Sequence, residues 1–254
     1  MKRYNNSHFT LRIGIVLSIL FVGMLVLFIE NNVVDVVFSP KKELPIYSVD
    51  RDDKKIAISF DAAWGNEFTG DILDTLDKYN IKSTFFLVGF WVDKYPEDVK
   101  EIVSRGHEIG NHSTNHPDMT KLSKEQMTSE LTTTEEKIFK LTSTKPILFR
   151  PPFGAYNDSV IQVARELGYF PIQWDIDSLD WKELGVEPVI DRVVKNVRSG
   201  SIVLFHNNAK YIKEYLPIVI ERVQAKGFEI VPISELIYRD NFEMDNTGRQ
   251  IYLK

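Results

Sequence analysis

The sequence predicts an α/β fold, a distorted (β/α) barrel of about seven parallel strands preceded by one N-terminal transmembrane helix. From residue 54 onward, short apolar runs alternate with segments of helical periodicity. Such alternation implies a parallel sheet with right-handed crossovers, built either as a barrel or as a doubly wound open sheet. Polar residues end several of the predicted strands. We expect the barrel, because it brings many strand ends together more naturally than an open sheet does.

Residues 13–29 form an apolar run that fits a membrane anchor. As a helix this run is about 26 Å long, near the short limit for a bilayer core of about 30 Å. Lys2, Arg3 and Arg12 precede it, and a positive flank stays in the cytoplasm. A cleaved signal peptide is the alternative, but no Ala-x-Ala-like site follows. We expect an uncleaved anchor, with the rest of the chain outside the cytoplasm.

The anchor sets the expected domain organisation. We expect a cytoplasmic tail at residues 1–12, the anchor at 13–29, a stalk at 30–53, the catalytic domain at 54–238 and a C-terminal tail at 239–254. A domain of this length can bury one full core.

In the first half of the domain, each predicted strand is an apolar run followed by a helical segment. Ser123 and Gln126 form a capping box, which marks the start of a long helix. The predicted strands are residues 55–60, 83–88 and 107–110, and the predicted helices are residues 68–79, 92–104 and 124 to about 141.

The second half continues the same pattern. Asn157 can cap a helix that begins near residue 158, and Gly168 and Gly227 end helices. The predicted strands are residues 147–150, 169–175, 202–206 and 228–231, and the predicted helices are residues 158–168, 188–197 and 212–226.

The composition excludes several classes of function. The net charge of −5 gives no electrostatic reason to expect a nucleic-acid partner. The chain has no cysteine, so any metal must be held by nitrogen and oxygen ligands. No Gly-x-Gly-x-x-Gly sequence follows a predicted strand, and no Gly-Lys-Ser/Thr loop is present. We therefore expect no nucleotide cofactor.

His112 and His116 are four residues apart, a spacing that presents two imidazoles on one face of a helical turn. Such a pair suits Zn²⁺, Co²⁺ or Ni²⁺. The alternative is a pair of ordinary surface histidines.

Three further polar residues end predicted strands, and each has a structural and a functional interpretation. Asp61 is either a helix cap or a general base for a metal-bound water. Arg150 forms either a structural ion pair or the contact that orients a catalytic carboxylate. His206 is either a satisfied core histidine or a catalyst. Asp175 ends another predicted strand, and Asp177 and Asp180 follow it; one of the three could tune a histidine.

Taken together, these residues resemble the polysaccharide deacetylases, the NodB-homology enzymes of carbohydrate esterase family 4. The resemblance covers roughly residues 54–237. The N-terminal anchor and the sequence Phe60-Asp61-Ala62-Ala63-Trp64-Gly65 resemble the sporulation-associated, PdaB-type subgroup. The motifs that carry it are Ser59-Phe60-Asp61, His112-Ser113-Thr114-Asn115-His116, Arg150-Pro151-Pro152-Phe153-Gly154, Asp177-Ser178-Leu179-Asp180-Trp181 and Leu204-Phe205-His206.

The resemblance implies a role for each motif. Asp61 would be the general base, His112 and His116 would bind a divalent metal, zinc or else cobalt or nickel, and Arg150 would hold Asp61. His206 would be the general acid. Further roles follow for residues that surround them: Asp180 would pair with the acid, the Phe153 backbone N–H would stabilise the oxyanion, and Trp181 and Leu204 would wall the acetyl pocket.

The implied reaction is metal-assisted removal of N-acetyl groups from peptidoglycan or a related cell-wall or spore-cortex glycan. Ala62 departs from the family pattern. In the family, the equivalent position carries an aspartate, which is the third metal ligand. A catalytically weak or inactive glycan-binding envelope protein is therefore a second hypothesis. A metal-free hydrolase that uses Asp61 and His206 is a third.

Overall fold

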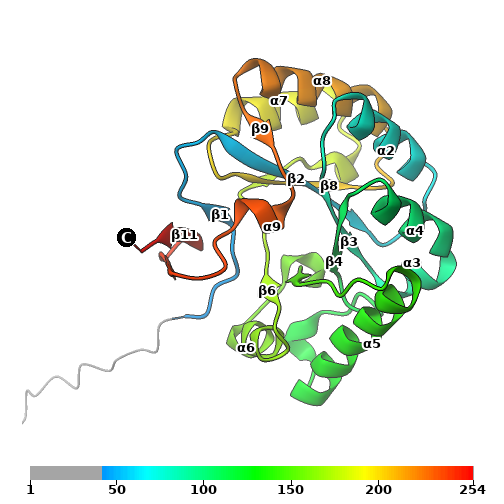
Figure 1. Ribbon diagram of the computed structural model, residues 1–254, viewed down its shortest axis with the longest axis vertical. Coiled ribbons are helices and arrows are strands. Elements are labelled where there is room, and N and C mark those ends of the chain that lie inside the picture. Colours follow the sequence, from blue (N-terminus) through cyan, green and yellow to red (C-terminus); the bar gives the residue numbers. More distant parts are fainter. Residues whose placement is uncertain (1–41, 254) are drawn as a thin grey trace, which may run out of the picture. The chain divides into compact units, whose positions relative to one another are not determined.

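A curled sheet of parallel strands forms the centre of the fold, with helices on its outer face (Figure 1). The structure is a computed structural model and describes residues 42–253. The strand order is β6-β5-β4-β3-β2-β8-β7, and β9 pairs with the beginning of β2. The strands are β2 (Lys55–Ala62), β3 (Thr84–Leu87), β4 (Glu108–Asn111), β5 (Leu148–Phe149), β6 (Phe170–Pro171), β7 (Ile176–Asp177), β8 (Ile202–His206) and β9 (Glu229–Ile230).

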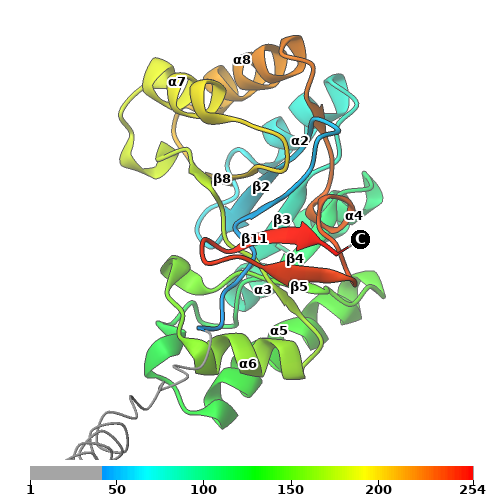
Figure 2. The ribbon, with the colours of Figure 1, turned by 90° about the vertical axis from the view of Figure 1, so that its left-hand side faces the viewer.

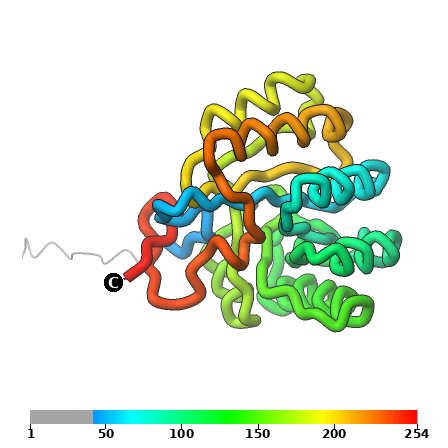
Figure 3. Tube along the Cα trace, turned by 45° about the horizontal axis from the view of Figure 1, so that its top comes forward, coloured from blue at the N-terminus to red at the C-terminus, as the bar shows by residue number. Residues whose placement is uncertain are grey.

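The helices follow one another around the outside of the sheet in the order α7-α8-α2-α4-α5-α6 (Figure 3). Helix α8 contacts α2, just as β8 pairs with β2, so the outer layer repeats the order of the strands. The helices are α2 (Thr69–Lys78), α3 (Gly89–Lys94), α4 (Pro96–Ser104), α5 (Lys124–Thr142), α6 (Asp158–Glu166), α7 (Val186–Asn196), α8 (Ile212–Ala225) and α9 (Ile233–Leu236), with short 3₁₀ turns η1 (Met119–Lys121), η2 (Pro152–Gly154) and η3 (Asp180–Lys182).

The sheet confirms the predicted parallel α/β architecture, but it is a curled half-barrel whose edge strands are β6 and β7. The strand predicted at residues 169–175 was wrong in its extent. After β6, Ile172 still donates to Phe149 of β5, whereas Asp175 already donates to Ile202 of β8. The chain leaves the sheet because it crosses the open side of the half-barrel between these two partners.

The helix predicted at residues 92–104 is two helices, α3 and α4. Pro96 occupies the first turn of α4, where its missing N–H costs no hydrogen bond. Tyr95 before it has φ −129° and ψ 55°, outside the helical region, because a proline restricts the residue that precedes it.

Side chains of β2 alternate between two faces, and this alternation places the polar site. Ile56, Ile58 and Phe60 are buried in the apolar layer between the sheet and the helices. Ser59 and Asp61 point the other way, toward the buried guanidinium of Arg150 inside the curl. A period of two is the property of a strand that produces this separation.

A second, smaller sheet is formed by β1 (Ser48–Val49), β10 (Phe242–Met244) and β11 (Arg249–Tyr252), shown in Figure 2. Its strands come from the ranges that the sequence assigns to the stalk and the C-terminal tail, so both ranges contribute to the folded unit. The Val49 N–H donates to the Gly200 carbonyl at 2.9 Å. A Cβ at Gly200 would lie 1.7 Å from the Val49 oxygen, so this approach requires glycine.

No helix between residues 42 and 253 is long and apolar enough to span a membrane. The anchor predicted at residues 13–29 lies outside the described residues and stays a prediction.

Candidate active site

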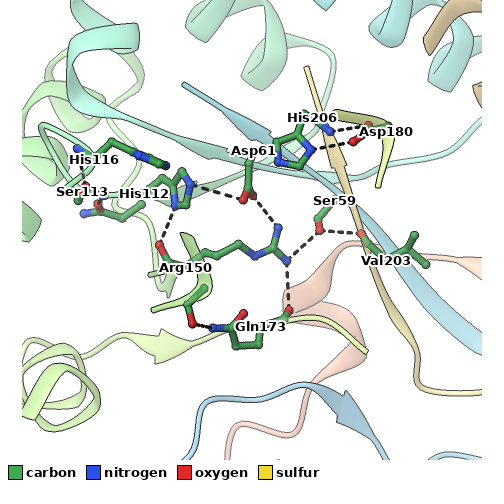
Figure 4. Close-up of polar contacts among 12 residues, drawn as sticks. Ser59, Asp61, His112, Ser113, His116, Arg150, Gln173, Asp180, Val203 and His206 are labelled. Carbon is green, nitrogen blue, oxygen red and sulfur yellow. Dashed lines mark hydrogen bonds and ion pairs between the residues drawn. The ribbon is translucent and has the colours of Figure 1, made fainter. Parts of the chain in front are cut away.

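The predicted site residues gather at the carboxyl ends of the central strands (Figure 4). Asp61 lies near the end of β2 and pairs in register with His206, the last residue of β8. His112 follows β4 directly, and Arg150 follows β5. Parallel strands end at the same edge, so residues far apart in sequence meet there.

Arg150 fixes the position of Asp61. Its side chain is fully buried, and Nη1 donates to Asp61 Oδ1 at 2.7 Å. Nη2 donates to Ser59 Oγ at 2.9 Å and to the Gln173 carbonyl at 3.2 Å. The guanidinium also lies 4.1 Å from the centre of the Phe86 ring. These contacts hold the guanidinium in one orientation, and with it the carboxylate.

The charges around Asp61 keep it ionised. Burial is the largest single influence and opposes ionisation, but the charge and hydrogen bond of Arg150, together with the charges of His112 and His206, bring the pKa of Asp61 below its ordinary value. Its second oxygen, Oδ2, lies 3.4 Å from His112 Nε2. A carboxylate of this kind can accept a proton from a water molecule bound beside it.

His112 has a defined tautomer. Its Nδ1 lies 2.7 Å from the Arg150 carbonyl oxygen, which only accepts hydrogen bonds, so Nδ1 carries the proton. Burial is the largest influence on this imidazole and lowers its pKa. The neutral ring therefore presents the lone pair of Nε2 toward Asp61 and the cleft, which is the form of histidine that binds metals.

His116 is brought beside His112 by a loop, and the predicted helical turn was wrong. Ser113 and His116 have φ of 66° and 54°, and the His116 N–H donates to Ser113 Oγ at 3.0 Å. The centres of the two imidazole rings are 4.9 Å apart. Burial lowers the pKa of His116 to about 4. Its Nδ1 is buried and has no hydrogen-bond partner within residues 42–253.

Within residues 42–253, no third side chain is grouped with these two imidazoles as a metal ligand. Ala62 is buried in the apolar layer, and the side chain of Asn66 donates to Asp98 at 2.8 Å. Among residues 42–253, no three histidine, aspartate or glutamate side chains are grouped so that they could hold a metal ion. The described residues therefore do not fit a complete catalytic metal site, although the two lone pairs suit a weaker one.

On the opposite side of the cleft, Asp180 is held by several hydrogen bonds. His206 Nδ1 lies 2.7 Å from Asp180 Oδ1, and Tyr215 donates to Oδ2 of the same carboxylate at 2.8 Å. The His206 N–H donates to that oxygen at 2.9 Å. Burial disfavours the charged imidazole, but the hydrogen bond and charge of Asp180 outweigh it and raise the pKa of His206. His206 is thus suited to donate a proton.

A cleft of about 580 Å³ lies above these groups. Arg150 lies buried beneath it, and the other eight predicted site residues line it: Asp61, His112, His116, Phe153, Asp180, Trp181, Leu204 and His206. Phe153 has φ 59°, in the left-handed region, and the residue is 69% exposed. The cleft is large enough for a sugar ring with its acetamide group.

Sequence reasoning missed two residues that support the site. Tyr215 lies on α8 in an otherwise apolar stripe and stacks on Phe205, with ring centres 5.6 Å apart. Gln173 supplies the carbonyl that accepts from Arg150, and its side chain donates to the Gly154 carbonyl at 2.9 Å. Neither residue stands out in the sequence, because its role depends on contacts between distant segments.

Comparisons with known proteins agree with this geometry. The profile of the polysaccharide deacetylase family matches residues 48–172. A peptidoglycan-N-acetylglucosamine deacetylase of Bacillus cereus is 37% identical over 196 residues, which cover 75% of this chain and 92% of that protein. An uncharacterised Bacillus subtilis protein, YlxY, is 35% identical over 193 residues, 76% of this chain and 60% of that one. The chain also matches 42% of the longer deacetylase PgdA of Listeria monocytogenes, at 36% identity over 80% of its own length.

The solved structures similar to this chain include a carbohydrate esterase and a pseudoenzyme. The family 4 carbohydrate esterase PdaA of Bacillus subtilis has a TM-score of 0.72 at 30% identity, covering 76% of this chain and 84% of that one. A CE4 family pseudoenzyme from Bacillus anthracis has a TM-score of 0.74 at 31% identity, covering 83% and 73%. A mutant of that pseudoenzyme is described as having restored enzymatic activity, with a TM-score of 0.73 at 35% identity over 76% and 70%.

Proposed function

Since the chain belongs to the polysaccharide deacetylase family, we propose that it is an N-deacetylase of a cell-wall polysaccharide, peptidoglycan or a related N-acetylated glycan. The observation that carries this proposal is the pairing of an ionised carboxylate, Asp61, with a histidine of raised pKa, His206, at the ends of two adjacent strands. Hydrolysis of an amide requires both groups, one to take a proton and one to give it.

In this proposal the substrate acetamide lies between the two groups. Asp61 takes a proton from a water molecule as the water oxygen bonds to the acetyl carbon. The Phe153 N–H stabilises the negative charge that forms on the acetyl oxygen. The C–N bond then breaks, His206 gives its proton to the departing nitrogen, and acetate and a free sugar amine are the products. Asp180 holds the ring of His206 in place.

The test is acetate release from purified peptidoglycan and from N-acetylglucosamine oligomers, with and without added Zn²⁺ or Co²⁺. Deacetylation by the full chain supports the proposal. No acetate under any of these conditions, from a folded protein that binds the glycan, supports the second candidate instead.

That second candidate is a catalytically weak or inactive glycan-binding protein of the envelope. Ala62 favours it, because two neutral imidazoles give no negative charge to offset a dication. The similarity to a CE4 pseudoenzyme points in the same direction. A chelator tests the third candidate, a metal-free hydrolase. Chelator-resistant acetate release would indicate that Asp61 and His206 suffice without a metal.

We further propose that the protein is anchored in the membrane by residues 13–29, with its catalytic domain outside the cytoplasm, and that it acts in sporulation or cell-wall maturation. The charge asymmetry around the apolar run supports the topology. Protease added to protoplasts should remove the domain. Complete protection, or a mature chain that begins near residue 30, would contradict this topology.

A further inference from the structure

Three large aromatic side chains stand exposed around the cleft. Trp64, Phe153 and Trp181 are 57%, 69% and 56% exposed, and all three line the cleft. Phe153 and Trp181 belong to motifs whose roles are described above, whereas Trp64 has none. An apolar ring left in water at the edge of a polar site suggests a surface that a ligand covers.

Trp64 is held firmly although it is exposed. Its ring meets the edge of His116, with ring centres 5.0 Å apart at 69°, and lies 6.4 Å from Phe90. The carbonyl of the next residue, Gly65, accepts hydrogen bonds from Trp91 Nε1 at 2.7 Å and from Asn207 Nδ2 at 2.9 Å. Because backbone and ring are both fixed, a ligand that covers Trp64 loses little affinity in ordering it.

Trp64 and Trp181 lie on opposite sides of the reacting groups. Trp64 contacts His116, whereas Trp181 follows Asp180, the partner of His206. Figure 4 shows His116 and Asp180 on either side of Asp61. We infer that one exposed indole lies beside the histidine pair and the other beside His206 and Asp180. A single sugar whose acetamide reaches Asp61 and whose ring meets Trp181 leaves Trp64 for a neighbouring sugar.

We propose that Trp64 is a stacking platform for a second sugar ring of the N-acetylated glycan, adjacent to the sugar that presents its acetamide to Asp61. A pyranose ring has an apolar face of C–H groups, and that face packs well on an indole. The platform makes the cleft select oligomers over single sugars. This inference rests on the proposed glycan substrate and does not require that the bound glycan be hydrolysed.

The experiment measures binding of the β-1,4-linked N-acetylglucosamine tetramer and of the monomer to the full chain by calorimetry. For wild type we expect the tetramer to bind more tightly. Trp64→Ala should lower the ratio of tetramer to monomer affinity by at least about fivefold, within the range measured for aromatic contacts. Trp64→Tyr should restore most of that ratio, because it returns an aromatic face. Phe139→Ala removes an aromatic ring that is 45% exposed on α5 and does not line the cleft, so it should leave both affinities unchanged.

Equal ratios for wild type and Trp64→Ala, with both proteins folded by circular dichroism, would overturn the platform. So would the absence of any tetramer binding by wild type. Acetate release is measured separately on the same proteins. If tetramer binding depends on Trp64 but no acetate is released, the stacking platform is supported and the deacetylase activity is rejected. If acetate is released but Trp64→Ala leaves the ratio of affinities unchanged, the deacetylase activity is supported and the stacking platform is rejected.

Discussion

The two sides of the cleft differ in how completely their polar atoms are bonded. Around Asp180, the carboxylate accepts from the ring and backbone of His206 and from Tyr215. Around His116, a buried Nδ1 has no partner within residues 42–253, and Ala62 adds no ligand. The half that would transfer a proton to the leaving group has its hydrogen bonds in place, whereas the half that would hold a metal has no third ligand among residues 42–253. An active site can therefore keep one part of its machinery while another is reduced.

The largest effect on the rate of acetate release is expected from changes to the two proton-transfer groups. If the protein releases acetate, Asp61→Asn and His206→Ala should each lower the rate by at least about 100-fold, the usual contribution of a general base or acid. Steady-state assays on variants with wild-type circular dichroism would show this. A near-normal kcat in either folded variant would remove that residue from the mechanism.

The buried ion pair tests whether the carboxylate is held as described. Arg150→Met keeps a long side chain but leaves Asp61 buried without its charge partner. Breaking a buried pair in this way costs about 3–5 kcal/mol of folding free energy. Urea unfolding at neutral pH provides the measurement, and Arg165→Met, at an exposed arginine, is the control. If Arg150→Met loses no more unfolding free energy than Arg165→Met, the ion pair between Arg150 and Asp61 contributes little to stability.

The incomplete half can be probed by restoring a ligand. Ala62 is the last residue of β2, and Ala62→Asp should tighten binding of Zn²⁺ or Co²⁺ by at least about tenfold, equivalent to about 1.4 kcal/mol. Ala62 faces the apolar layer, where an unpaired charge is costly, so we expect the introduced carboxylate to turn at the strand end toward the two imidazoles and complete the coordination that they begin. Calorimetric titration decides the matter. Equal affinities would mean that another residue completes the site or that the histidines bind no metal, and His116→Ala tells these outcomes apart.

The smallest predicted effect is a shift in pH dependence. Asp61 must be deprotonated and His206 protonated, so activity should fall as pH rises through the pKa of His206, which lies above 6.5. Activity should fall at the acidic side only below the ordinary pKa of an aspartate, 3.8. Asp180→Asn removes the charge that raises the pKa of His206 and should move the alkaline limb to lower pH. A limb that does not move would show that another group sets it.

The sequence carried enough information for the fold and for the residues around the cleft, because both depend on local pattern. Apolar runs such as residues 55–60 mark strands, and the polar residue after each run marks the carboxyl end of the sheet. The crossing of residues 172–175 from β5 to β8 was not visible, since it depends on which distant strands are near. The role of Tyr215 could not be predicted either, because its sequence pattern indicates only an apolar helix face. The loop geometry at His116 also depends on contacts that the sequence does not show.

The measurement that tests the difference between the two halves most directly is zinc anomalous scattering from crystals of wild type and Ala62→Asp, grown at equal zinc concentration. The account predicts a strong peak between His112, His116 and the introduced carboxylate in the variant, and a weak peak or none in wild type. An equally strong wild-type peak, with a third protein ligand bound, would contradict it.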